Sequence, residues 1–500
     1  MGCQPWRRKA AGYLTVATIL VRNVSIGRRS GLDVRVGPQT VLEVGPGLAL
    51  RVGEEVLDGA GGALIPGLHD HHVHLRAVVA ARQSVDVSGL ARLADFDQVI
   101  SLAVANASPE ASLRVVGWHE ALTGSLDRYR LDALSGRAPV RVQHRSGALW
   151  VLNSAELDRV GAMSSGLPGI ERDDQGKPTG RLFRLDGWLR SRSFSDDSVE
   201  SFARGLRAYA AECAQFGITG WTDATPDRER DDASELSRLA EAGVFRQRLV
   251  LMTPPVGLSV PLDEDGGLAG QLEVGPAKIM LDDTVLPGQH ELAHVIRSAH
   301  RAARAVAIHC VTASQLIVAV AAFEIAGTAD DRIGCDRIEH AGVVPPGYAQ
   351  RLASLDLAVV TQPGFIRARG NDYLREVAAA EQEWLYPAAT LMRAGVKVAA
   401  STDAPFGPAD PWQCIVSAVT RECPDGQVVG AAERVSPHRA LRMFWAAPED
   451  VRRTRTVSPG QPAELCLLHV PLREALADLP VVPVRATLVR GLLAKLSAPP

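Results

Sequence analysis

The hydrophobic positions of the chain follow two different patterns. Short runs rich in Val, Ile and Leu, separated by glycine and proline, occupy residues 15–65 and return in residues 464–491. Such runs predict the strands of a small β-sheet domain. Between them, apolar runs alternate with helix-like segments, which is typical of parallel β-α-β units. We therefore expect a composite β-sandwich domain from both chain ends, residues 1–65 and 455–500, and an α/β domain of residues 66–454.

Eight apolar runs of the middle region are candidates for parallel strands. They are ALIPGLHDHHVHL (63–75), GITGWTDA (217–224), FRQRLVLM (245–252), AKIMLDD (277–283), AVAIHC (305–310), DRIEHA (336–341), LAVVTQP (357–363) and KVAASTD (397–403). Eight is the number of strands in a closed (β/α)8 barrel, so we predict a TIM-like barrel. Residues 86–210 do not follow the alternation, and we expect them to form a long insertion after the first strand.

Composition and charge restrict the partners of the chain. Its 500 residues are 46% apolar and 22% charged, as in ordinary globular proteins. A net charge of −3 provides no broad basic surface for nucleic acid, and no apolar run reaches the ~20 residues of a membrane helix. We expect a small-molecule substrate and neither a nucleic-acid nor a membrane partner. The sequence leaves open whether the chain forms a homo-oligomer.

Cysteine usage and the chain start indicate the compartment. The seven cysteines include no C-x-x-C pair, so neither a disulfide framework nor a cysteine zinc site is predicted. A cytoplasmic, reducing location fits this best. The segment WRRKAAGYLTVATILV resembles a signal peptide but lacks an A-x-A-like cleavage site. We predict a strand in TVATILVRNVSI, with secretion as the alternative.

The stretch HELAHVIRSAH (290–300) fits the H-E-x-x-H pattern of zinc proteases. Its apolar residues form one helical stripe, which places His290 and His294 on the opposite face, towards solvent. Arg297 stands where a glycine would end the helix in the three-histidine version, and an unbroken helix would separate His300 from His290 by about 15 Å. The pattern therefore favours an ordinary amphipathic helix.

Other histidines fall at strand ends, where they can converge. His72 and His74 alternate by two, so both side chains point to the same side of a strand and can bind one metal ion. His309, His340 and Asp403 end three further predicted strands. Parallel barrel strands all finish at the same mouth, so these five groups are expected to meet there. Imidazoles plus a carboxylate are the ligands of zinc or a similar divalent ion.

Lys278 is a less direct candidate for the same site. It lies in AKIMLDD, which we place at the start of the fourth strand. Because an ammonium cannot bind a cation, Lys278 would have to be neutral or carboxylated, and a carboxylated lysine could bridge two ions. The alternative is a structural lysine paired with Asp282 or Asp283.

The strand-end motifs resemble those of the amidohydrolase superfamily. PGLHDHHVHL, AIHC, RIEH and STDAP are similar to its motifs on strands one, five, six and eight. The chain is closer still to the YtcJ-like branch, amidohydrolase family 3, which includes N-substituted formamide deformylases. GWHEALTGSLDRYRLDAL, PVRVQHRSGALWVLNSAEL and GKPTGRL resemble the insertion of that branch, and GPAKIMLDD, TQPGF and EWLYPAATLMRAGVKVAASTDAP resemble its later parts. The resemblance extends from about residue 12 to 495 and implies the barrel, the composite β-domain and a hydrolytic metal site.

The resemblance also implies roles for single residues. It implies that the metal ligands are His72, His74, Lys278, His309, His340 and Asp403. Asp403 is also implied to be the catalytic acid/base group, and Asp70 is expected to orient a ligand from behind. The chain departs from the branch at Ser146-Gly147-Ala148, where relatives often have S-G-H, and at CVTAS and LDD. No proposed ligand is lost, so these departures concern the substrate.

The expected activity is metal-dependent hydrolysis of a C–N bond, other than a peptide bond, in an amide, formamide or imide. A divalent ion, Zn²⁺ in the first instance and one or two per chain, would activate the water. Deamination or another hydrolysis at the same site is the alternative, and a barrel without catalysis is another. Four insertion residues are candidates for a lid over the substrate, unless the tryptophans simply pack the insertion: Trp118, His119, His144 and Trp150.

Overall fold

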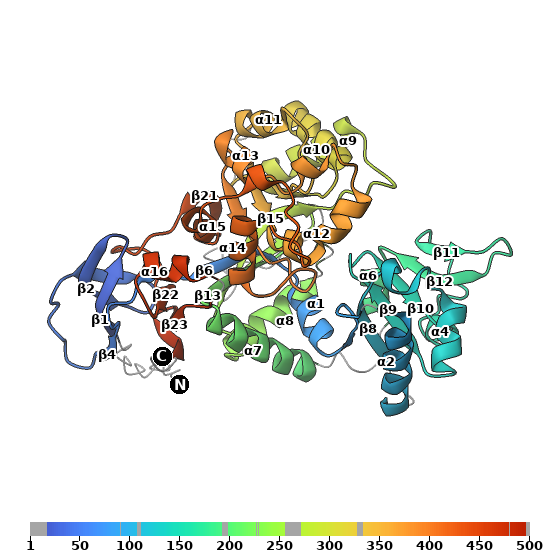
Figure 1. The fold of residues 1–500 in the computed structure, drawn as a ribbon, viewed down its shortest axis with the longest axis horizontal. Helices are drawn as coiled ribbons and strands as arrows, with labels where there is room; N and C mark the ends of the chain where they lie inside the picture. The colour runs from blue at the N-terminus through green and yellow to red at the C-terminus, as the bar shows by residue number, and fades with distance from the viewer. Residues whose placement is uncertain are drawn as a thin grey trace, which may run out of the picture. The chain divides into compact units, whose positions relative to one another are not determined.

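The computed structural model describes residues 18–90, 92–107, 112–192, 199–226, 228, 230–255, 272–327, 334–479 and 481–496. The signal-like start and the first residues of the strand predicted from Thr15 lie outside this set. The chain divides into two compact units, one formed by the segments up to Leu68 and from Arg455 onward, the other by His69–Thr454 (Figure 1).

The first unit contains two four-stranded sheets. One has the order β3-β2-β1-β4 and consists of β1 (Ile19–Ile26), β2 (Arg29–Val36), β3 (Val41–Gly45) and β4 (Glu55–Asp58). The other has the order β24-β23-β22-β5 and consists of β5 (Leu64–Pro66), β22 (Leu465–Leu468), β23 (Val484–Val489) and β24 (Leu492–Leu496). The helix α16 (Leu472–Ala477) connects β22 and β23. Because β5 pairs antiparallel with β22, the two chain ends build one domain around a shared core that includes Val21, Val34 and Leu465.

The second unit contains a sheet of eight strands in the order β19-β18-β17-β16-β15-β14-β13-β6. They are β6 (Leu68–Val73), β13 (Ile218–Asp223), β14 (Arg248–Thr253), β15 (Leu272–Ile279), β16 (Val306–Cys310), β17 (Arg337–His340), β18 (Ala358–Thr361) and β19 (Val398–Ala400). The pairs from β13 to β19 are parallel. Each strand overlaps one of the eight predicted runs, which confirms the predicted fold class.

The gap between the first and last strands is bridged by backbone hydrogen bonds. The Asp403 N–H donates to the His72 carbonyl at 2.9 Å, and the His74 N–H donates to the Ala404 carbonyl at 3.0 Å. The chain therefore joins β6 to the segment that follows β19, at the ends of the strands where the predicted site residues lie.

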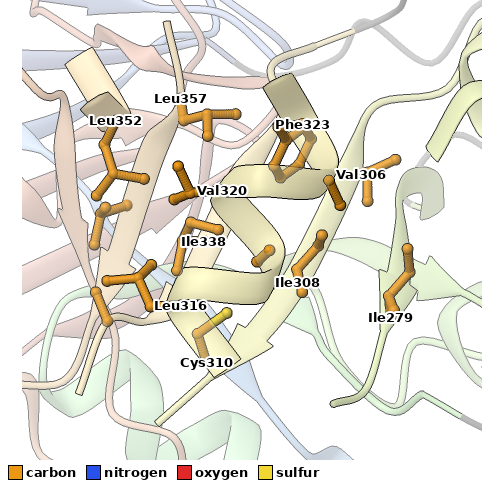
Figure 2. Close-up of a cluster of buried hydrophobic side chains, with 14 of the residues drawn as sticks. Ile279, Val306, Ile308, Cys310, Leu316, Val320, Phe323, Ile338, Leu352 and Leu357 are labelled. Carbon is orange, nitrogen blue, oxygen red and sulfur yellow. The ribbon is translucent and has the colours of Figure 1, made fainter. Parts of the chain in front are cut away.

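Helices accompany the strands, and several of them bury apolar side chains in a core shared with the strands. They are α1 (Leu75–Arg82), α7 (Val199–Gln215), α8 (Arg230–Glu241), α9 (Gln289–Arg301), α10 (Ala313–Ala326), α11 (Tyr348–Ser354), α12 (Gly364–Glu376), α13 (Ala388–Arg393), α14 (Pro411–Thr420) and α15 (Pro437–Met443). A short hairpin of β20 (Ala446–Ala447) and β21 (Asp450–Thr454) follows. Figure 2 shows Val320 and Phe323 of α10 near Ile308 and Ile338 of the strands, in one cluster of buried residues.

The insertion has a sheet of its own, in the order β11-β12-β10-β9-β8-β7. Its elements are β7 (Val85–Asp86), α2 (Leu93–Asn106), β8 (Leu113–Trp118), α3 (Glu120–Thr123), α4 (Arg128–Ser135), β9 (Val140–His144), β10 (Leu149–Leu152), α5 (Ser154–Arg159), β11 (Ile170–Arg172), β12 (Pro178–Phe183) and α6 (Asp186–Arg190). The helix α7, which the sequence assigned in part to the insertion, packs against α1 and β13. It therefore belongs to the helical layer of the barrel.

Two smaller observations concern cysteines and membranes. The cysteines of the described segments are buried and form no disulfide. Among the described residues, no helix has the length and apolar character required to cross a bilayer.

The buried cluster in Figure 2 predicts a stability difference between two isoleucines. Ile308→Ala removes a fully buried side chain from β16 and should lower the free energy of unfolding by about 2–5 kcal/mol, because a cavity remains. Ile317→Ala, on α10 with 38% of its surface exposed, is the control and should change it by less than about 0.5 kcal/mol. Urea unfolding followed by circular dichroism measures both, and equal effects would contradict the packing described.

Candidate metal centre and active site

The structure brings the predicted ligands together at one end of the barrel. They lie at or just beyond the carboxyl ends of the strands and line one cavity: His72, His74, Lys278, His309, His340 and Asp403. Asp403 Oδ1 lies 3.3 Å from His74 Nε2 and 3.7 Å from His72 Nε2, and its Oδ2 lies 3.8 Å from His340 Nδ1. The rings of His309 and His340 are 4.6 Å apart between centroids. The side chains therefore form one contiguous cluster.

Burial determines the protonation of this cluster. It lowers the pKa of His72, His309 and His340, and the nearby Lys278 adds to the effect. These imidazoles are therefore neutral at pH 7 and have a lone pair for a cation. Burial alone would raise the pKa of Asp403, but the polar contacts of its carboxyl with His72 and His74 hold it below its usual range, so this carboxyl is ionised.

This donor set suits a divalent cation. His72, His340 and Asp403 each offer a ligand atom, and these atoms lie within 4.8 Å of one another. Neutral imidazoles and a carboxylate are the ligands that Zn²⁺ and related ions take in proteins.

Lys278 lies at the carboxyl end of β15, and the prediction that it starts the strand was wrong. The strand begins at Leu272, and its register against β14 shifts after Val274, so one extra residue accommodates Gly275-Pro276. Lys278 lies after this shift, and its side chain lines the cavity.

The Lys278 amine is buried and has no hydrogen-bond partner among the described residues. Burial lowers its pKa to about 8. The predicted alternative, an ion pair with a neighbouring aspartate, does not form. Asp282 pairs with Arg184 at 2.9 Å, and Asp283 accepts from Thr312 at 2.7 Å.

Side chains behind the ligands orient two of the imidazoles. His72 Nδ1 contacts the Glu339 carboxylate, which also accepts from Arg337 Nε at 2.6 Å. His340 Nδ1 donates to Gln362 Oε1 at 2.8 Å. Each contact fixes the tautomer and leaves Nε2 for a ligand. Glu339 and Gln362 were not predicted from the sequence, although the carboxylate directly before the strand-end histidine in RIEH was a sign of a buried partner.

Asp70 supports the site through the backbone. Its carboxylate accepts from the Thr402 N–H at 2.9 Å, from the Thr402 hydroxyl and from the His72 N–H at 3.4 Å. Burial raises the pKa of Asp70 to about 7. Asp70 thus ties β6 to the residue that precedes Asp403.

Two site residues have left-handed backbone conformations. The φ angle is 70° at His340 and 54° at Asp403. Residues with a Cβ adopt this region at a cost of about 1–3 kcal/mol, and such residues concentrate at functional sites. The conformation occurs where β17 and the segment after β19 turn into the cavity.

The cavity has a volume of about 1730 Å³ and is lined by the barrel mouth and by the insertion. Of the four predicted lid residues only Trp150 lines it. Trp118 is packed in the insertion core and donates to Thr123 at 2.7 Å. The turn of Ser146, Gly147 and Ala148, where the sequence departs from the related branch, lines the cavity instead.

His119, Glu120 and His144 form a second group whose ligand atoms lie within 4.8 Å of one another. His144 Nε2 lies 3.0 Å from a Glu120 oxygen. The Arg145 guanidinium lies 2.7 Å from His119 Nε2, and this positive charge opposes a cation there. The barrel-mouth cluster is the better candidate for a metal site.

Comparisons with known proteins identify the family of the chain. Residues 55–493 match the model of the Amidohydrolase family. The chain belongs to the Amidohydrolase family. The N-substituted formamide deformylase of Arthrobacter pascens is 27% identical to it, over 88% of this chain and 89% of its own.

Two further relatives of this amidohydrolase cover most of the chain. The putative amidohydrolase YtcJ of Bacillus subtilis (strain 168) is 22% identical, over 86% of this chain and 88% of its own. The structure of an uncharacterized metal-dependent hydrolase from Pyrococcus furiosus has a TM-score of 0.67 and 21% identity, covers 89% of this chain and is covered over 97% of its length. The likeness to this solved structure concerns the fold alone. The family and its hydrolase members identify this chain as a hydrolase.

The protease-like stretch contributes no metal site to this amidohydrolase. His290 and His294 on α9 are exposed, as predicted, and Glu291 is exposed as well. His300 is buried and pairs with Asp336 at 3.0 Å, which is a structural contact.

The two groups of histidines predict opposite outcomes on substitution. His72→Ala with His74→Ala removes two clustered imidazoles and should abolish metal retention, measured by elemental analysis of the purified protein. His290→Ala with His294→Ala removes two exposed imidazoles and should leave the metal content unchanged. Loss of metal from the second variant with retention in the first would show that the histidines of α9 bind the metal.

Proposed function

We propose that this amidohydrolase hydrolyses a C–N bond in an amide, formamide or imide of a small molecule, with one or two divalent ions, Zn²⁺ in the first instance. The supporting observation is the convergence of four histidines, Asp403 and a buried unpartnered lysine on one cavity. His72, His74, His309, His340 and Asp403 would hold the ion. When bound, it supplies a Lewis acid that polarises a carbonyl and lowers the pKa of water.

Asp403 is the proposed proton carrier. Its carboxylate is ionised because His72 and His74 hold its pKa low, so it can accept a proton from the attacking water. The same carboxyl then delivers this proton to the leaving nitrogen. The backbone of β6 holds Asp403 through its N–H, so the carboxyl stays beside the imidazoles.

The cavity supports a substrate with a sizeable group on nitrogen. Its volume of about 1730 Å³ exceeds the ~300–1,000 Å³ of common ligand sites. Phe365, Tyr373 and Phe406 line it. An apolar substituent can bury against these rings, which fits the N-substituted formamides named for the Arthrobacter relative.

A substrate panel tests this reaction class. Metal-loaded protein is incubated with N-formyl, N-acyl, cyclic imide and aminopyrimidine compounds, and released amine, acid or ammonia is measured. We expect turnover of an N-formyl or N-acyl compound. Turnover of aminopyrimidines alone would show a deaminase, and a zinc-bound protein inactive on the whole panel would contradict the proposal.

Asp403→Asn should lower turnover by about 10² to 10⁴-fold, because the amide keeps the shape but cannot accept the proton. Metal content is measured beside the rate, so that lost metal is not mistaken for lost chemistry. Asp282→Asn also removes a cavity carboxylate, one paired with Arg184, and should leave the chemical step unchanged. A fully metallated Asp403→Asn protein with a normal rate would exclude this residue from the mechanism.

Lys278 decides whether one or two ions are bound. A carboxylated Lys278 would form when the neutral amine adds CO2 and releases a proton, and its oxygens would be available to hold a second ion. Metal-free protein should regain activity faster when metal is returned with bicarbonate, and Lys278→Ala should reduce the bound metal from about two ions to one. Recovery indifferent to bicarbonate, with one ion in both proteins, would establish a mononuclear site.

A further inference from the structure

The turn between β9 and β10 touches the segment that contains Asp403. A Cβ added to Gly147 would lie 2.4 Å from Phe406 Cε1, and the φ of this glycine is +75°. Only glycine fits both the conformation and the space. The Phe406 ring lies 5.5 Å from the His74 ring, and the Phe406 N–H donates to the Asp403 carbonyl at 2.8 Å. The insertion thus contacts the active site through one aromatic ring.

Arg369 of α12 stabilises this contact. Its Nη2 donates to the Arg145 carbonyl at 2.9 Å and to the Phe406 carbonyl at 2.6 Å. Its guanidinium carbon lies 4.5 Å from the centre of the Phe365 ring, which is almost fully buried. One guanidinium nitrogen therefore joins the strand end before the turn to the loop after Asp403, and the stacked ring fixes its orientation.

A second contact holds the same turn to the same helix. The Arg145 guanidinium forms an ion pair with Asp372, one turn further along α12. Both side chains are largely shielded from solvent. The helix therefore determines where the turn lies, and Ser146, Gly147 and Ala148 form a wall of the cavity.

We propose that Arg369 is a positioning residue that holds the Gly147 turn and Phe406 as a fixed wall beside His74 and Asp403. It acts through Phe406, without contacting the reacting atoms. A displaced ring would let the substrate bind with its carbonyl misaligned, and a misplacement of about 1 Å can reduce turnover about 10²-fold. The kinetic part of this inference rests on the proposed hydrolysis, whereas its structural part does not.

Arg369→Met, Arg369→Lys and the control Arg367→Met, which removes an exposed guanidinium from the same helix, test the inference. Hydrogen exchange is measured at the Gly147, Phe406 and Gly407 amides, which are hydrogen-bonded within their turns. Exchange should rise at these amides in Arg369→Met and stay unchanged in Arg367→Met. Unchanged exchange in Arg369→Met would overturn the proposal, whether or not a substrate has been found.

Kinetics on the best N-formyl or N-acyl substrate of the panel separate positioning from mere stability. Arg369→Met should keep its metal and lose about 10²-fold in kcat with a smaller change in KM, and Arg369→Lys should recover part of the rate. Gly147→Ala disturbs the same contact. The double variant Gly147→Ala with Arg369→Met should therefore lose less kcat than the product of the two single fold-losses. Normal kcat in a metallated Arg369→Met protein, or losses that multiply fully, would overturn the proposal.

Discussion

The hydrogen bonds between β6 and the segment after β19 are the constraint on which the candidate site depends. The Asp403 N–H to His72 carbonyl bond and the His74 N–H to Ala404 carbonyl bond join residues more than 300 positions apart in the chain. They place the carboxylate of the last strand beside the two imidazoles of the first. Asp70 strengthens the same junction by accepting from Thr402. The ligands from the middle strands then follow from barrel geometry, because parallel strands end at one mouth.

The electrostatics of this junction favour a cation. Glu339 is compensated by Arg337, whereas Asp403 is ionised among imidazoles that burial keeps neutral. A buried carboxylate without an opposite charge costs several kcal/mol, so the cluster is complementary to a positive ion. Burial lowers the pKa of Lys278 to about 8, so a larger fraction of its amine is neutral at pH 7 than in an exposed lysine. The same burial makes its neutral amine available for carboxylation.

Much of the fold and of the cluster could be predicted from the sequence, for identifiable reasons. His72 and His74 alternate by two along one strand, and His309, His340 and Asp403 end three others. Because parallel barrel strands end at one mouth, these five residues could be placed together before any contact between them was known. The start of β15 could not be predicted, because the strand continues through Gly275-Pro276 with one extra residue and its register is set by pairing with β14. Glu339 and Gln362 were missed because hydrogen bonds to a ligand leave no spacing pattern. The contact of Gly147 with Phe406 depends on how the insertion folds back, which no local pattern encodes.

The central claim is that the barrel-mouth cluster, and not another group of donors, is the metal centre. Anomalous X-ray diffraction from crystals of the zinc-loaded full chain, collected on both sides of the zinc absorption edge, locates the ion directly. The account predicts a zinc-specific peak between His72, His340 and Asp403, with a second peak near Lys278 if this lysine is carboxylated. A peak only at His119, Glu120 and His144, or none at the barrel mouth, would contradict it.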